Sequence, residues 1–219
     1  MRNWIIRYAV FIIGLYFLTL GVVLIIRSSL GTSPISSFSY VLSLNTPLTL
    51  GMATFILNML LIAGQFWFLR GIGTRRDYME IMMQIPFSLL FSAFLDINMY
   101  LFRGMTPESY AGALAFLAVG CLIQAFGVVL EIKPNVVAMS GEGFVKYAAR
   151  RFGKDFGRVK VMVDVGLVLL AVVTSLSMTH SIIGVRAGTL VAALGVGLLV
   201  SFINTRLISH IPVHRILRR

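Results

Sequence analysis

Residues 21–27 read GVVLIIR, and residues 127–133 read GVVLEIK. The two stretches begin 106 positions apart, close to half of the 219-residue chain, and each ends a long apolar run. An internal repeat is a strong indication of the fold, because a repeat that is missed leads to the wrong fold for the whole chain. We interpret the pair as a duplication that divides a single membrane domain into residues 1–106 and residues 107–219. The same displacement, without gaps, relates Gly14 to Gly120, Phe38 to Phe144, Gly51 to Gly157, Asn58 to Asp164, and Leu61 to Leu167.

The composition of the chain is that of a protein that crosses a membrane several times. Hydrophobic residues make up 58% of the sequence and charged residues 12%, with a mean hydropathy of +0.92. A soluble domain carries about 25% charged residues. The sequence predicts an all-α, polytopic membrane protein with six transmembrane helices, each formed by an apolar stretch of about 20 residues. The six stretches are residues 4–26, 50–69, 81–102, 110–132, 159–178 and 183–207.

The placement of positive charge predicts the orientation. The chain has 19 lysines and arginines against 8 acidic residues, a net charge of +11. With a cytoplasmic N-terminus, all 19 except Arg27, Arg103 and Arg186 fall on the cytoplasmic side. Cytoplasmic loops carry such an excess. We therefore expect both termini in the cytoplasm, and the basic tail, residues 210–219, on anionic lipid headgroups rather than on nucleic acid.

Orientation and repeat together predict an inverted topology. Three spans separate the two copies, so the first helices of the two copies cross the membrane in opposite directions. The halves are then related by a pseudo-two-fold axis in the membrane plane. Many secondary transporters have this arrangement, with the substrate near the midplane at the repeat interface. Some channels share it, and a fold alone does not decide a function.

The connection after the first span, residues 28–48, predicts a half-helix. Ser33 followed by Pro34 is typical of a helix start, with a hydroxyl N-cap and a proline in the first turn. About three turns, roughly 15 Å long, fit before the sequence NTP at residues 45–47 ends the helix. Irregular backbone at membrane depth must be buried in protein or line a cavity, and serine hydroxyls suit that setting. The alternative is a short helix on the outer surface with its serines in water.

The connection after the fourth span, residues 133–158, predicts the equivalent segment of the second copy. Ser140 is expected to cap a helix whose first turn carries Glu142, and that carboxylate complements the helix dipole. One side of this helix is apolar and the other is basic. The alternative is therefore a basic amphipathic helix in the cytoplasmic interface. The basic side consists of Lys146, Arg150, Arg151 and Lys154.

Five short motifs resemble those of the YczE-like integral membrane proteins, which are related to the YitT group. They are LGTSP at residues 30–34, LGM at 50–52, FLD at 94–96, the spacing from Arg158 to Asp164, and GVRAGTL at 184–190. The chain departs from that family at Ile35-Ser36, where relatives often have tryptophan and aspartate, and at residues 140–143, SGEG, in place of a glycine- and proline-rich segment. The resemblance covers nearly the whole chain. It implies a bacterial plasma-membrane protein that is expected to act as a transporter.

Two aspartates inside the spans are candidate ionisable sites, because charged groups within a membrane are costly. Asp164 lies early in the fifth span, where Lys160 or Arg158 can neutralise it. It is expected either to form a structural ion pair or to carry a coupling proton or cation. Asp96 lies late in the third span, and the alternative there is an interfacial aspartate bonded to a neighbouring helix.

Signatures of catalysis are missing from the sequence. It contains no H-E-x-x-H, G-x-S-x-G or P-loop pattern. The three histidines are scattered at span ends or in the tail, and Cys121 is the single cysteine. No disulfide can form within one chain, and we expect no metal site, no cofactor and no enzymatic activity.

These expectations combine into one functional hypothesis, a secondary transporter for a small polar or anionic metabolite bound near the midplane. The N–H groups at the start of each half-helix would bind an anion. The expected binding residues are Ser33, Pro34, Ser36, Ser37 and Asn58 from the first copy, and Ser140, Glu142 and Gly143 from the second. Asp164 and Asp96 would be the ionisable residues. The alternatives are a channel or lipid-translocating protein on the same scaffold, and a non-transporting partner or sensor subunit.

Overall fold

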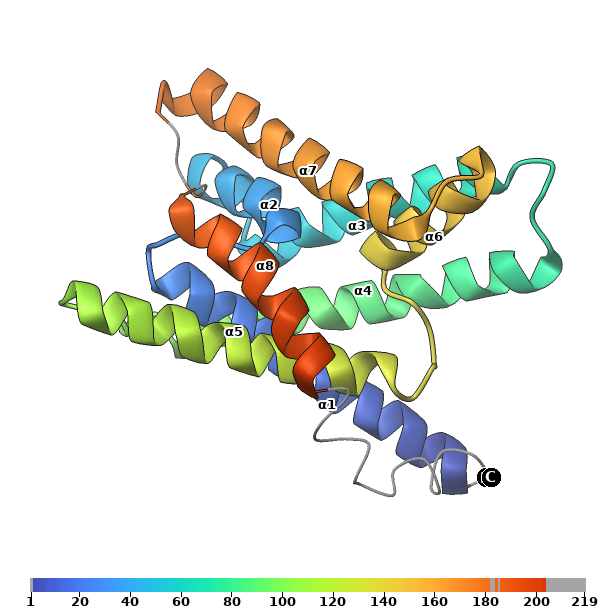
Figure 1. The fold of residues 1–219 in the computed structure, drawn as a ribbon, viewed down its shortest axis with the longest axis horizontal. Helices are drawn as coiled ribbons and strands as arrows, with labels where there is room; N and C mark the ends of the chain where they lie inside the picture. The colour runs from blue at the N-terminus through green and yellow to red at the C-terminus, as the bar shows by residue number, and fades with distance from the viewer. Residues whose placement is uncertain (1, 182–183, 185, 204–219) are drawn as a thin grey trace. The chain divides into compact units, whose positions relative to one another are not determined.

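The regular structure of the chain is helical throughout the residues that the structure, a computed structural model, describes: 2–181, 184 and 186–203. This confirms the predicted all-α class. The helices are α1 (Arg2–Arg27), α2 (Pro34–Asn45), α3 (Leu50–Leu69), α4 (Arg75–Leu101), α5 (Tyr110–Ile132), α6 (Ser140–Phe152), α7 (Phe156–Thr179) and α8 (Ala187–Phe202) (Figure 1).

Five helices in the described part of the chain are long and apolar enough to cross a membrane, namely α1, α3, α4, α5 and α7. The chain is therefore a multi-pass membrane protein. The expected sixth span, residues 183–207, runs into residues outside the described ones. Its described part, α8, is 16 residues long.

Helix α4 begins earlier than the sequence predicted, at Arg75 rather than at residue 81. A reciprocal cap at its first turn explains the difference. The Thr74 hydroxyl donates to Asp77 Oδ2 at 2.8 Å, and the Asp77 N–H donates back to Thr74 Oγ1 at 3.3 Å. Such a pair satisfies N–H groups that a helix start leaves free. The helix therefore extends past the apolar stretch into a charged first turn.

The helices form two compact units. One comprises Met1–Ser33, Ile97–Val136 and Arg186–Arg219, and the other comprises Pro34–Asp96 and Val137–Val185. We call them the α1 unit and the α2 unit after the first helix of each. The α1 unit holds α1, α5 and α8, and the α2 unit holds α2, α3, most of α4, α6 and α7. Each unit thus takes helices from both halves of the sequence.

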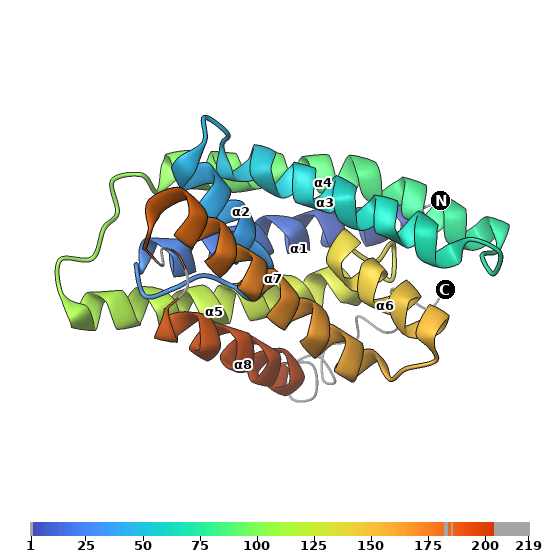
Figure 2. The ribbon, with the colours of Figure 1, turned by 90° about the horizontal axis from the view of Figure 1, so that it is seen from above.

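In the α1 unit, α1 and α5 pack antiparallel, and glycines allow them to approach closely. The four contacts are Gly14 with Glu131, Gly21 with Gln124, Gly120 with Ile25, and Gly127 with Leu18. At each of them an added Cβ would collide with the backbone of the partner helix. Small residues bring membrane helices together in this way. Helix α8 also packs on α5 (Figure 2). The four glycines form two pairs displaced by 106 positions, so each half of the sequence contributes two of the glycines.

The segment that follows α1 is held at the start of α8, within the α1 unit. The Leu30 carbonyl accepts a hydrogen bond from the Gly188 N–H at 3.0 Å. The Thr32 N–H donates to Thr189 Oγ1 at 3.1 Å. These bonds fix the chain up to Ser33, the residue before α2 begins.

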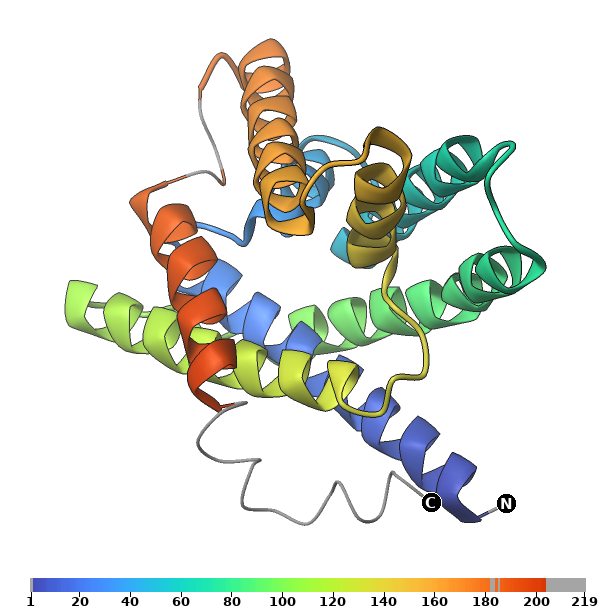
Figure 3. The same cartoon turned by 45° about the vertical axis from the view of Figure 1, so that its right-hand side comes forward.

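In the α2 unit, α2 packs on α3 and α7, and α6 packs on the same two helices (Figure 3). Helices α2 and α6 begin at residues 34 and 140, and α3 and α7 begin at residues 50 and 156, so both pairs are displaced by 106. The caps follow the same rule. Thr49 accepts the Met52 N–H at the start of α3, and Asp155 accepts the Arg158 N–H at the start of α7.

The N-terminal ends of the two short helices meet in the core of the α2 unit. A Cβ built on Gly141 would lie 2.5 Å from Ile35 Cδ1, so the first turns of α2 and α6 are in direct contact. Around them lie three pairs of residues displaced by 106 positions, namely Phe38 and Phe144, Leu57 and Val163, and Leu61 and Leu167. The helices are 12 and 13 residues long, so a short helix follows the first long helix of each half of the sequence. Neither is long enough to span a membrane alone.

Candidate functional site

The candidate site is built on the first turn of α6, inside the α2 unit. Ser140 is the first residue of α6 and is 1% exposed. Its hydroxyl donates to Asn58 Oδ1 of α3 at 2.7 Å. The Gln65 side-chain amide donates to the Ser140 carbonyl at 3.1 Å. The predicted residues Asn58 and Ser140 therefore lie together, joined by a hydrogen bond between helices.

A pair of buried glutamines extends this cluster to α4. Gln65 Nε2 donates to Gln84 Oε1 at 2.8 Å, and Gln84 Nε2 donates to Gln65 Oε1 at 2.9 Å. Both side chains are fully buried. Gly143 of α6 lies directly against the pair, since a Cβ there would be 2.6 Å from Gln84 Nε2 and 2.7 Å from Gln65 Oε1. The residue at position 143 must therefore be small for α6 to reach the amides.

Gln65 and Gln84 were not among the residues that the sequence singled out for binding. A signal was present on α3, because Asn58 and Gln65 lie seven positions, about two turns, apart and share one face. Gln84 carries no comparable signal in the sequence. Its place in the cluster depends on how α4 packs beside α3 and α6.

The start of α6 has no side-chain cap. The N-cap residue is Met139, which forms no capping hydrogen bond, so the prediction that Ser140 caps this helix is wrong. The Ser140 hydroxyl bonds to Asn58 instead. By contrast Thr49, Ser109 and Asp155 each accept an N–H at the start of their helices. An uncapped helix start carries free N–H groups and a partial positive charge.

Two carboxylates, those of Glu142 and Asp164, lie near Lys160 of α7. Glu142 is in the first turn, as predicted, and is partly buried. Burial raises the pKa of Glu142, and the positive charge of Lys160 on α7 opposes that rise in part. Lys160 Nζ also donates to Asp164 Oδ1 at 2.8 Å, one turn along α7. Of the two arrangements expected for Asp164, the structural ion pair is present.

The serines of the first half-helix are buried. Ser33, Ser36 and Ser37 are 6%, 7% and 0% exposed, so the alternative of a surface helix with its serines in water does not fit. Pro34 is the first residue of α2. We call Asn58, Gln65, Gln84, Ser140 and Gly143 the α6 cluster. Ser33 ends the α1 unit, so the predicted residues of the first half-helix that share a unit with this cluster are Pro34, Ser36 and Ser37.

Asp96 serves the structure of the α2 unit at the other end of α3. Its Oδ2 accepts the Thr49 hydroxyl at 2.6 Å, and its Oδ1 accepts the Gly51 N–H at 2.7 Å. A carboxylate at a helix N-terminus is stabilised by the helix dipole. The predicted alternative, an aspartate bonded to a neighbouring helix, is therefore present. Gly51 is about 10 Å along the helix from Asn58, so Asp96 is not part of the α6 cluster.

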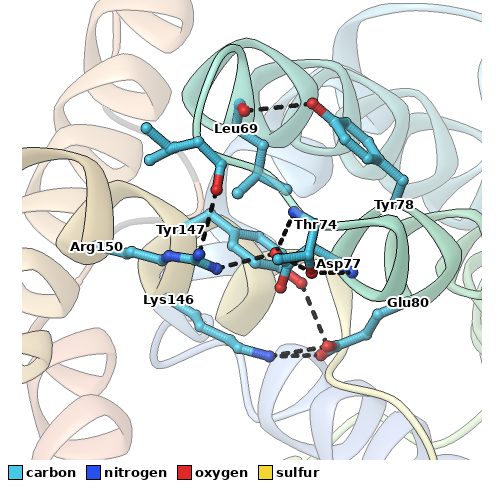
Figure 4. A network of polar contacts seen from close by, with 9 residues as sticks. Leu69, Thr74, Asp77, Tyr78, Glu80, Lys146, Tyr147 and Arg150 are labelled. Carbon is cyan, nitrogen blue, oxygen red and sulfur yellow. Dashed lines mark hydrogen bonds and ion pairs between the residues drawn. The ribbon is translucent and has the colours of Figure 1, made fainter.

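The basic side of α6 forms ion pairs with the start of α4 (Figure 4). Lys146 Nζ lies 2.7 Å from Glu80 Oε1, and Arg150 Nη1 lies 2.9 Å from Asp77 Oδ2. The buried Tyr147 hydroxyl donates to Glu80 Oε2 at 3.2 Å. Burial, with the negative charge of Glu80, raises the pKa of Tyr147. The sequence suggested lipid headgroups as partners for Lys146 and Arg150, but their partners in the structure are carboxylates.

Metal binding finds no support in the described part of the chain, where no three His, Cys, Asp or Glu side chains are grouped to hold an ion. The cluster can instead offer amide, hydroxyl and backbone N–H groups to a polar ligand. Its members in the described structure come from α3, α4 and α6.

Comparison with known proteins places the chain in a family. No curated protein and no solved structure matches it. A model described as "Family of unknown function (DUF6198)" matches residues 5–205, a range that includes every residue of the α6 cluster. The match covers most of the chain, which therefore belongs to the DUF6198 family.

Proposed function

We propose that the protein is a secondary transporter that binds a small polar or anionic metabolite at the start of α6. The observation that carries this proposal is an uncapped helix end among the buried amides of Asn58, Gln65 and Gln84. Free N–H groups at a helix start attract anions. Buried amides add donors and acceptors that fix the orientation of a polar ligand.

An inverted repeat supports the same function. Helix starts, caps and glycine contacts recur at a displacement of 106, and α1 and α5, the first helices of the two copies, run antiparallel. We infer that residues 1–106 and 107–219 are the two copies of an inverted repeat. Transporters with such repeats build their sites from discontinuous helices whose N-termini face the substrate. Helices α2 and α6, which meet at their first turns, fit that role.

Buried polar atoms without partners are a second support. In the described part of the chain they are Arg27 Nε, Ser39 Oγ, Ser88 Oγ, Ser92 Oγ, Asn98 Oδ1 and Gln124 Oε1. Buried polar atoms in native proteins are bonded to protein, water or ligand. We infer that water or a polar solute reaches these atoms, three of which belong to the α2 unit. A tightly packed, non-transporting subunit would not need such atoms.

Glu142 is the residue that we propose to carry a coupling proton. Asp164, the other candidate, already accepts a hydrogen bond from Lys160. Glu142 lies in the first turn of α6, where its burial favours the protonated form. An anion that binds the helix start would favour that form further, because like charges repel. Anion and proton would therefore enter together.

Uptake into liposomes tests the proposal. Purified protein is reconstituted, small carboxylates and phosphate esters are added outside under an inward proton gradient, and the solutes that enter are identified by mass spectrometry. We expect Asn58→Leu with Ser140→Ala to lower uptake by about tenfold, as the loss of one hydrogen bond to the metabolite from each side chain implies. The matched control is Ser177→Ala, because that exposed hydroxyl donates to the Thr174 carbonyl of its own helix.

Two results would contradict the proposal at different points. Uptake equal to that of protein-free liposomes would remove the transporter hypothesis. Uptake that Asn58→Leu with Ser140→Ala leaves unchanged would keep a transporter but reject this site.

The proposed orientation has both termini in the cytoplasm of a bacterial plasma membrane. It is supported by the bias of positive charge along the sequence and by the resemblance to YczE-like proteins. With this orientation, the ion pairs of α6 lie at the cytoplasmic end of the α2 unit, and α2 leads toward the outside.

A further inference from the structure

A shallow and open apolar groove runs along the exposed face of α4. It has a volume of about 630 Å³ and is lined by Arg75, Tyr78, Met79, Met82 and Met83. These positions follow the spacing of one helical stripe. Met79 and Met82 are 62% and 56% exposed, and the stripe from Arg75 to Met83 is about 12 Å long. The groove is therefore charged at Arg75 and apolar along Met79, Met82 and Met83, which we call the methionine stripe.

Aromatic residues place the charged end of the groove at a membrane interface. Helices α3 and α4, both long enough to span, meet here in a short turn. Trp67 is 64% exposed near the end of α3. Tyr78 stacks on Phe66 with ring centroids 5.9 Å apart. Tryptophan and tyrosine are enriched in membrane proteins at the level of the lipid headgroups. The methionine stripe therefore extends from that level toward the hydrocarbon core.

The positive charge of this turn is not balanced by nearby carboxylates. Arg70, Arg75 and Arg76 are exposed, and none of them forms an ion pair with another described residue. The acidic residues of the first turns of α4 are already engaged, Asp77 by Arg150 and Glu80 by Lys146. An arginine cluster without counter-ions at the headgroup level attracts phosphate groups.

We propose that this face of the α3–α4 hairpin binds an anionic phospholipid, with its phosphate on Arg75 and an acyl chain along Met79, Met82 and Met83. A soluble anion would contact the arginine but not the methionine stripe. A zwitterionic lipid would bring its own positive headgroup beside the arginines. Flexible methionine side chains adapt to a lipid chain. The site is separate from the α6 cluster and does not depend on the transport proposal.

Native mass spectrometry of the full chain in mild detergent tests the site, with phosphatidylglycerol and phosphatidylcholine as probes. We expect phosphatidylglycerol to bind more tightly. Arg75→Ala and Arg76→Ala should each weaken it by about fivefold, the effect of one basic residue near an anionic surface. The matched control is Arg103→Ala, since Arg103 is exposed at the other end of α4 and lies over Tyr100, 4.6 Å from the ring centroid.

A second pair of variants tests the methionine stripe. Met79→Asn with Met82→Asn should weaken phosphatidylglycerol binding, whereas Met52→Asn on the exposed face of α3 should not.

Equal binding of the two lipids would overturn the proposal, and so would arginine variants that bind as well as the wild type. Glycerol phosphate that competes as strongly as the lipid would show a soluble-anion site instead. Arg75→Lys keeps the positive charge and should therefore retain the preference for phosphatidylglycerol over phosphatidylcholine. Loss of that preference in Arg75→Lys would contradict the electrostatic argument.

Discussion

Gly143 is the point at which the backbone of α6 touches the side chains of α3 and α4. A methyl group there would overlap the Gln65–Gln84 amide pair. We expect Gly143→Ala to lower the free energy of unfolding by about 1–3 kcal/mol, the usual cost of overpacking a core. Unfolding in detergent can be followed with a thiol-reactive dye, because Cys121 is the one cysteine and is 5% exposed.

The control for Gly143 is a helical glycine with open space around it. A Cβ on Gly166 of α7 would meet no atom within 4 Å. Gly166→Ala should therefore leave the melting temperature unchanged or raise it, because alanine favours a helix by roughly 0.5–1 kcal/mol over glycine. Equal melting of the two variants would show that the glutamine pair is not closely packed against α6.

Glu142 gives a prediction on pH. Burial raises the pKa of Glu142, so the folded protein keeps a proton at pH values where the unfolded chain has lost it. The free energy of unfolding then decreases as the pH rises through the interval between the unfolded and folded pKa values. We expect the melting temperature to fall as the pH rises above 4.5, the ordinary pKa of a glutamate, and to fall less in Glu142→Gln. Glu108→Gln, at an exposed residue, should keep the wild-type slope.

Among the helices, α6 and α4 are joined by ion pairs. Glu80→Lys and Lys146→Glu should each destabilise the α2 unit, and the double variant should recover part of the loss because the pair is restored in reverse. The Lys146 and Glu80 side chains are 46% and 25% exposed, so we expect a coupling energy of no more than about 1 kcal/mol from a double-mutant cycle. Lys154→Glu, at an exposed residue next to α6, serves as the control. Additive effects of the two changes would mean that the pair does not contribute.

The lengths of the elements followed from local sequence, but their partners did not. Ser33-Pro34 and Asn45-Thr46-Pro47 enclose α2 as predicted, because caps and prolines act within a few residues. The start of α4 was missed because a Thr74–Asp77 cap lies outside the apolar pattern. Lys146 and Glu80 are 66 positions apart in the sequence. Charge patterning on α6 showed a basic face, yet only the packing of α6 beside α4 shows what that face contacts.

At the scale of the whole molecule, each of the two compact units combines helices from both halves of the sequence. The α1 unit combines α1 with α5 and α8, and the α2 unit combines α2, α3 and most of α4 with α6 and α7. A half of the sequence expressed alone would leave the glycine faces of α1 or α5, and the buried amides around α6, without their partners. Exposed glycine faces and unpaired amides favour misfolding or degradation.

We therefore expect residues 1–106 and 107–219 to fail to fold alone but to assemble when expressed together as two chains. Division in the loop between α4 and α5 leaves every helix intact. The measurement is co-purification of an untagged half with a tagged one, followed by thermal melting of the complex. Two tagged copies of one half serve as the control, since a half that merely aggregates would also capture itself. If each half melts cooperatively on its own, then the half of the sequence is the folding unit, and the α1 and α2 units are not.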